Sequence, residues 1–234
     1  MFFPYFFSNP LIELAIFATF GLSIWAQFKV KGNYEAYAKV AASSGISGAE
    51  AARHLLNRNG LANVPVEPTR GHLTDHYDPI HRVVRLSEGV YYGRSISSIS
   101  IASHEVGHAI QHSEAYSMLV LRHRIFPILN FTSGLTPMLF LIGFLFNSLN
   151  LVLVGILFFA TVVAFQLITL PVEFNASSRA KQLMVAEGFI RNEEERGVSK
   201  VLNAAALTYV AAAAMALLQL LRYVFIFLNM RDDD

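Results

Sequence analysis

Long apolar runs alternate along this chain with two polar segments. The first run has Glu13 near its start as its only charged residue, and another covers residues 125–170, which is 46 residues without a charged side chain. Because about 20 apolar residues cross a bilayer, residues 125–170 predict two spans, separated by the polar break at 147–150. The pattern therefore predicts four transmembrane helices, at about residues 11–28, 125–146, 151–170 and 204–227.

Buried core helices are the alternative interpretation of these runs. Core helices normally carry a polar face, which the runs lack. Arg222 lies near the end of the last run, where an arginine can extend to the membrane interface. The chain is 54% hydrophobic and 15% charged, whereas a soluble domain carries about 25% charged residues. We therefore expect a mainly α, multi-pass membrane protein that forms one domain over residues 1–234.

Two segments, residues 29–124 and 171–203, should form a small soluble α+β part. A Ser47–Glu50 capping box opens one of its helices, which should end at Gly60. Residues 72–79 are turn-rich. The remaining pattern predicts helices at 33–43, 95–114 and 172–187, and short strands at 64–67 and 81–87.

The distribution of lysine and arginine predicts which side of the membrane each segment faces. Of 18 lysines and arginines, 16 lie in residues 29–124 and 171–200, which the positive-inside bias places in the cytoplasm. Both termini should then lie outside. The first span should remain as an anchor, because it lacks a positive n-region and a cleavage site. A net charge of +1 gives no reason to expect nucleic acid, and the absence of cysteine excludes disulfides, thiolate zinc ligands and a cysteine nucleophile.

The sequence His104-Glu105-Val106-Gly107-His108 contains candidate metal ligands and a candidate catalytic base. Residues four apart share one face of a helix, so His104 and His108 can bind one metal ion. Glu105, one position further round, can take a proton from a water on that ion. The alternative is a helix that holds two histidines by chance. Gly107 lets another element approach the helix closely.

A catalytic zinc needs a third protein ligand. The metzincin pattern is excluded, because Gln111 and Glu114 occupy its glycine and histidine positions. His112 lies about 80° round the helix from His104 and is a poor ligand. Glu173, just beyond an uncharged span, is the better candidate. Its alternative interpretation is a solvated glutamate at a helix start.

The chain resembles the YugP-like neutral zinc metallopeptidases of bacterial membranes. The resemblance rests on HEVGHAIQH, the preceding LTDHYDP and LSEGVY, and the later LPVEFNAS, and it covers nearly the whole chain. The wider similarity is to the membrane gluzincins, the prenyl-protein and HtpX-type proteases. There the third ligand is the glutamate of a Glu-x-x-x-Asp pattern, which corresponds to Glu173. The aspartate position is Ser177 here, so Asn175 or another acid would have to orient a ligand histidine.

The resemblance implies a zincin-like catalytic part in a bacterial inner membrane. It implies one zinc per chain, bound by His104, His108 and Glu173, and peptide hydrolysis with Glu105 as general base. Apart from the resemblance, candidates for stabilising the oxyanion are Tyr91, Tyr92, His76 and Arg179, and for each of them a structural role is the alternative that we favour. The strand at Arg82–Ser87 could pair with an extended substrate, or could be an ordinary edge strand.

A loop with three histidines and two aspartates, His72, Asp75, His76, Asp78 and His81, could scaffold the active site, contact substrate or hold a second metal. We favour the scaffold. Three functions compete for the whole chain: a zinc endopeptidase, an inactive membrane scaffold with a structural zinc, and a transporter. The transporter ranks last, because no charge lies in mid-span. Expected partners are membrane lipid, a membrane-associated protein or peptide substrate, and a second copy or a regulatory membrane protein.

Overall fold

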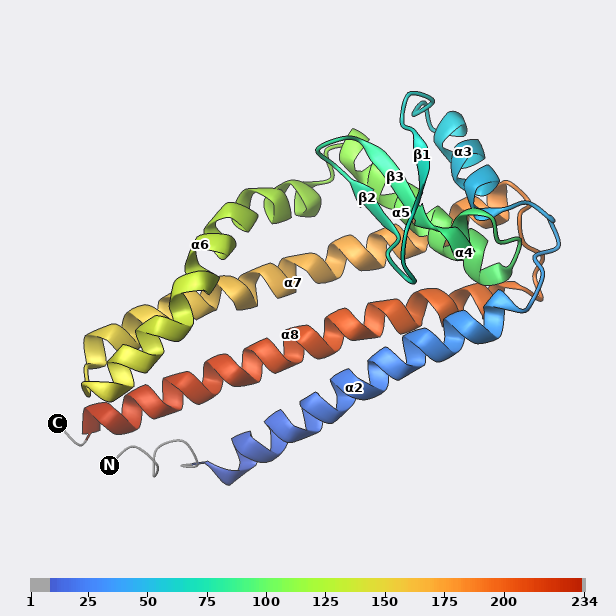
Figure 1. Cartoon of the computed structure of the whole chain (residues 1–234). Helices are drawn as coiled ribbons and strands as arrows, with labels where there is room; N and C mark the ends of the chain where they lie inside the picture. Colours follow the sequence, from blue (N-terminus) through green and yellow to red (C-terminus); the bar gives the residue numbers. More distant parts are fainter. Residues whose placement is uncertain (1–8, 233–234) are drawn as a thin grey trace. The chain divides into compact units, whose positions relative to one another are not determined.

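The computed structural model describes residues 9–232 and is mainly helical (Figure 1). The expectation about the two chain termini themselves lies outside the described residues. The elements in chain order are α2 (Pro10–Ala38), α3 (Gly48–Arg58), β1 (Val66–Thr69), β2 (His76–Asp78), β3 (Val83–Ser87), α4 (Glu88–Tyr91), α5 (Ile96–Ser113), α6 (Ser117–Leu145), α7 (Leu149–Ala186) and α8 (Glu195–Asp232).

Four of these helices, α2, α6, α7 and α8, are long and apolar enough to cross a membrane. They include the four predicted spans except for Phe146, which lies in the turn between α6 and α7 at residues 146–148, with Asn147 at a φ of 48°. Two expected boundaries were wrong. The helix expected at 33–43 is the end of α2, which stops at Ala38, and the helix expected at 172–187 is the end of α7. In both places helical backbone continues directly from the apolar run into the polar segment.

The chain divides into two compact units. Unit 1 comprises Met1–Trp25, Val120–Leu170 and Thr208–Asp234, and unit 2 comprises Ala26–Leu119 and Pro171–Leu207. In unit 1, a small core gathers large side chains of α6, α7 and α8: Phe140, Val152, Ile156, Ile226 and Met230. Unit 2 has a larger core around α5, in which Ile99, Ala102 and Val106 are fully buried.

Unit 2 contains a three-stranded mixed sheet in the order β1-β3-β2. β1 pairs parallel to β3, and β2 pairs antiparallel to β3. The expectation that β3 offers a free edge to substrate was therefore wrong, because β3 is the central strand and both of its edges are paired. β2 was not expected at all, since it lies in the turn-rich stretch at 72–79.

Local signals explain the helices of unit 2. The capping box at the start of α3 is present, because Ser47 and Glu50 bond each other's backbone, and Gly60 follows the helix at a φ of 73°. The side chain of Ser95 accepts a hydrogen bond from the Ser98 backbone and so caps α5. At the other end of α5, Ala115 has a φ of 50°, which turns the chain away. These caps fix where α5 begins and ends.

Candidate metal centre

α5 carries the two predicted histidine ligands on one buried stretch. The side chains of His104 and His108 are 13% and 14% exposed, and Glu105 between them is buried. The neighbouring positions Ala102, Val106 and Ala109 pack into the core of unit 2. Because the apolar side of α5 is held by that core, the histidine side has a fixed direction.

Glu173 reaches these histidines because α5 and α7 approach closely. A Cβ atom added at Gly107 would lie 2.9 Å from the backbone oxygen of Ala176 and 3.2 Å from its Cα. Glycine is therefore required at this point of contact between the two helix backbones. Glu173, three residues before Ala176, is buried at 3% exposure. A glutamate that merely began a solvated helix would not be buried in this way.

The three side chains converge on one point. His104 Nε2 and His108 Nε2 are 3.2 Å apart, and Glu173 Oε2 lies 3.4 Å from the first and 3.6 Å from the second. Zinc binds nitrogen and oxygen ligands at about 2.0–2.1 Å in a tetrahedron, so its ligand atoms should be about 3.4 Å apart. The triangle fits such an ion. We call these three residues the His-His-Glu cluster.

Each histidine of the cluster also has a hydrogen-bond partner at its other ring nitrogen. Ser177 Oγ lies 3.2 Å from His104 Nδ1, and Gln111 Oε1 lies 3.0 Å from His108 Nδ1. Such partners orient a ligand imidazole toward a metal. Ser177 therefore fills the position of the aspartate in the gluzincin pattern. Asn175 does not contact His108 in this arrangement but bonds Gln111 at 2.9 Å.

Electrostatics in the cluster favour positive charge. Burial lowers the pKa of His108, but a hydrogen bond that the ring donates to the Glu173 carboxylate and the nearby charge of Glu105 outweigh burial, so the net pKa is raised. A site in which carboxylates favour a charged imidazole also favours a bound cation. In the part of the chain that is described, this cluster is the one group of three or more metal-ligating side chains that lie close together.

The candidates for stabilising an oxyanion lie in different surroundings. Tyr91 packs against the core of unit 2 and meets the exposed Tyr92 edge to face at 4.8 Å. Arg179 lies about 240° round α7 from Glu173, and it bonds Asn175 and Glu114 at 2.8 and 2.7 Å. Arg179, Asn175 and Glu114 line a cavity of about 430 Å³ whose lining includes none of the three cluster residues. Arg179 thus faces away from the cluster, and a role for Tyr91 stays a prediction.

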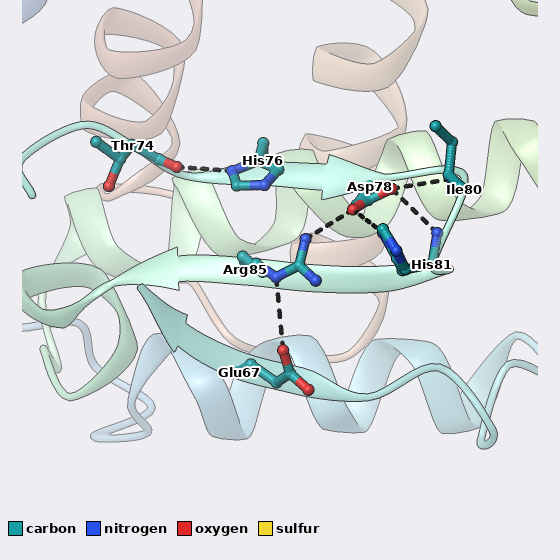
Figure 2. Close-up of polar contacts among 7 residues, drawn as sticks. All are labelled: Glu67, Thr74, His76, Asp78, Ile80, His81 and Arg85. Carbon is teal, nitrogen blue, oxygen red and sulfur yellow. Dashed lines mark hydrogen bonds and ion pairs between the residues drawn. The ribbon is translucent and has the colours of Figure 1, made fainter. Parts of the chain in front are cut away.

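His76 lies on the sheet face away from α5. Side chains alternate along a strand, and its neighbour Tyr77 points toward α5, where the Tyr77 hydroxyl lies 2.8 Å from His112 Nδ1. His76 itself is exposed and bonds the Thr74 carbonyl at 2.8 Å (Figure 2). Neither His76 nor Tyr77 is therefore placed to contact the reacting atoms. His112, as expected, is a neighbour of the cluster rather than a member of it.

Asp78 organises the turn between β2 and β3 and the outer face of the sheet (Figure 2). Its carboxylate accepts hydrogen bonds from the backbone nitrogens of Ile80 and His81, and it pairs with Arg85 at 2.7 Å. Arg85 continues to Glu67 at 3.5 Å. The Arg85 guanidinium and the bonds from His81 hold the pKa of Asp78 far below its usual range. These contacts account for Asp78 and His81 as scaffold.

The other members of this loop have similar partners. Asp75 accepts hydrogen bonds from the backbone and hydroxyl of Ser87 at 2.7 and 3.0 Å, and burial raises the pKa of Asp75. His72 meets Tyr34 edge to face at 4.8 Å. The histidines and aspartates of the loop are therefore not gathered around one point, and the scaffold interpretation accounts for them better than a second metal.

Two residues that support the cluster were not identified from the sequence. Gln111 was used only to exclude the metzincin pattern, yet it is completely buried. Its position three residues after His108, on the same helix face, was the available signal. Ser177 was noted as a departure from a carboxylate, although a hydroxyl can also bond an imidazole nitrogen.

The chain is similar to known proteins over most of its length. The chain is 70% identical, over 217 residues, to a protein of Bacillus subtilis (strain 168) named "Putative membrane protease YugP"; the match covers 93% of this chain and 96% of that relative. Together with the four apolar helices, this similarity indicates a multi-pass membrane protein. No solved structure shows a significant match. A family described as "Putative neutral zinc metallopeptidase" matches residues 12–228. The chain therefore belongs to this family, as its motifs predicted.

Proposed function

We propose that this protein is a membrane-embedded zinc endopeptidase that binds one zinc ion per chain through His104, His108 and Glu173. The observation that carries the proposal is the triangle of ligand atoms, with sides of 3.2, 3.4 and 3.6 Å. Two neutral imidazoles and one carboxylate form the donor set of a gluzincin site, which keeps a fourth position open for water.

A bound zinc ion would supply Lewis acidity, lowering the pKa of a water toward about 7 and polarising the scissile carbonyl. Glu105 then acts as the general base that accepts the proton of the attacking water. The same carboxyl group passes that proton to the leaving amine. Glu105 suits this role by position, because it is the residue next to His104 on α5 and is buried beside the cluster.

An extended substrate would lie along β2. β2 is an outer strand of the sheet, and the Tyr77–His112 bond fixes it against α5 one turn beyond His108. A peptide that pairs with this edge would be held by main-chain hydrogen bonds, which suits cleavage within a chain rather than at its end. The membrane helices favour a membrane-associated protein or peptide as the substrate.

The test is a comparison of wild type with Glu105→Gln, each purified in lipid nanodiscs. Zinc is measured by elemental analysis, and cleavage by mass spectrometry of a peptide library prepared from membrane proteins. We expect one zinc in both proteins and at least ~10²-fold fewer cleavage products from the variant. Equal zinc but no product specific to the wild type would favour an inactive scaffold. A wild type without zinc would contradict the proposed metal site.

We also propose that the cluster faces the cytoplasm of a bacterial cell whose inner membrane holds the four helices. Cysteines introduced at Ser148 and Asn9 should react with an impermeant thiol reagent in intact cells. Cysteines at Ser44 and Asn192 should react only after permeabilisation. The chain has no native cysteine to interfere. The reverse pattern would contradict the charge argument and leave the cluster intact.

A further inference from the structure

Gln111 occupies a position in α5 where every polar atom of its side chain has a partner. The residue has no exposed surface. Its Oε1 lies 3.0 Å from His108 Nδ1, and its Nε2 donates to the Val172 carbonyl at 2.8 Å and to Asn175 Oδ1 at 2.9 Å. One side chain therefore joins a ligand histidine to the α7 backbone beside Glu173.

These partners fix which way the Gln111 amide points. The Val172 carbonyl can only accept a hydrogen bond, so it must face the NH₂ group. Asn175 gives an independent check, because its Oδ1 also accepts from Arg179 Nε at 2.8 Å, and a guanidinium can only donate. Asn175 therefore presents oxygen to Gln111 as well. Both observations leave the Gln111 oxygen facing His108.

An amide oxygen facing His108 Nδ1 can only accept, so Nδ1 must carry the proton. In the neutral ring the lone pair of His108 then lies on Nε2, where a metal ion can bind it, and Nε2 is the atom directed at His104 and Glu173. His104 differs, because its partner Ser177 is a hydroxyl that can donate or accept. Only one of the two histidines thus has its tautomer dictated by its surroundings.

We propose that Gln111 is a positioning residue that selects the Nε2-binding tautomer of His108 and holds α5 in register with Glu173. The proposal rests on the proposed zinc site. Gln111 needs no contact with substrate, and it acts on zinc affinity through His108. Loss of a hydrogen bond of this kind costs ~10–100-fold in metal affinity.

The experiment measures the zinc dissociation constant of full-length protein in nanodiscs by competition with a chromophoric chelator at neutral pH. Gln111→Met keeps the approximate volume but offers no acceptor, so we expect a ~10–100-fold loss of affinity. Gln111→Glu can offer an oxygen to His108 and, as the neutral acid, a proton to the Val172 carbonyl. We expect its affinity to stay within a few-fold of wild type.

Gln182→Met is the matched control, because Gln182 is an exposed glutamine on α7. It should bind zinc as the wild type does. Wild-type affinity in Gln111→Met would overturn the proposal, as would equal losses in Gln111→Met and Gln111→Glu, which would indicate a tether without tautomer selection. Thermal unfolding of the metal-free proteins separates misfolding from loss of affinity. A wild type that binds no zinc would instead overturn the proposed site.

Discussion

Polar side chains find their hydrogen-bond partners in different ways in the two units. In the unit 1 helices, hydroxyl groups bond the carbonyl three or four residues earlier on the same helix. Such bonds are made by Thr19, Thr132, Thr136, Thr161 and Thr169. In unit 2 some buried polar groups also bond locally, as Ser100 does to the Ile96 carbonyl, but others join elements far apart in sequence. Ser97 bonds the Tyr34 carbonyl at 2.9 Å, and Gln111 bonds α7, 61 residues away.

This difference follows from what each unit must do. A helix in lipid has to satisfy its polar groups internally, so local bonds suffice and each span can form by itself. The cluster in unit 2 exists only where segments 26–119 and 171–207 meet. Zinc binding should therefore be sensitive to substitutions at the α5–α7 contact and insensitive to comparable ones in unit 1.

The largest effect should come from Glu173→Ala. Removing the one anionic ligand leaves two imidazoles, and we expect zinc affinity to fall by more than the ~10–100-fold typical of an outer hydrogen-bond partner. Elemental analysis after dialysis against a weak chelator measures the loss. Glu187→Ala is the control, since Glu187 follows α7 and pairs with His54 and Arg58. Full zinc retention in Glu173→Ala would mean that another residue is the third ligand.

Two glycine-to-alanine substitutions test the same contrast in packing. In Gly107→Ala the new methyl would collide with the Ala176 backbone, which cannot move without shifting α7. We expect a loss of ~1–3 kcal/mol in unfolding free energy and weaker zinc binding. A Cβ added at Gly134, in α6, would meet no described atom within 4 Å apart from the neighbouring backbone of its own helix, so Gly134→Ala should raise stability by up to ~1 kcal/mol. Denaturation of both variants, with and without zinc, measures the difference. Equal effects would contradict a tight α5–α7 contact.

The fold could be predicted from the sequence where local pattern decides it. Hydropathy alone gave four helices, and the Ser47–Glu50 capping box gave the start of α3. β2 was not predicted, because His76, Asp78 and the following Pro79 favour turns. Pairing with β3 and the Tyr77–His112 contact make it a strand. Tertiary contacts of this kind leave no periodic signal in three residues.

The candidate site shows the same division. His104 and His108 follow from helical spacing, and Glu173 from its place beyond an uncharged span and from the family resemblance. Gln111 was not recognised as buried, because a glutamine in a helix normally faces solvent and its place on the histidine face of α5 was the available signal. Only the approach of α7 at Gly107 encloses it. The residues that hold the cluster in place are thus harder to predict than the cluster itself.

Glu13 and Arg222 form a charged contact between two helices of unit 1, where most of the hydroxyl bonds described above are local. Arg222 Nε lies 3.0 Å from Glu13 Oε1, joining α2 to α8. From the sequence, Arg222 was expected only to extend to the interface. Both side chains are partly exposed, at 20% and 13%, so we expect a coupling of ~1 kcal/mol. Glu13→Gln, Arg222→Gln and the double variant give this coupling by unfolding in nanodiscs. Additive losses would contradict it, and zinc content should stay unchanged in all three.

The smallest effect should come from Thr132, whose hydroxyl lies 2.6 Å from that of Thr161 and joins α6 to α7 within unit 1. Thr132→Val keeps the shape and removes the bond. Hydrogen bonds between membrane helices contribute only ~0.6 kcal/mol on average, because the separated helices satisfy their hydroxyls internally. Thr132 can do so through its own bond to the Ile128 carbonyl at 2.9 Å. Thr136→Val is the matched control, since the bond of Thr136 is to the Thr132 carbonyl of the same helix. A double-mutant cycle of Thr132→Val with Thr161→Val should return a coupling near this average, with zinc binding unchanged. A coupling of several kcal/mol would show that polar contacts between helices matter as much in unit 1 as in unit 2, and the contrast between the units would not hold.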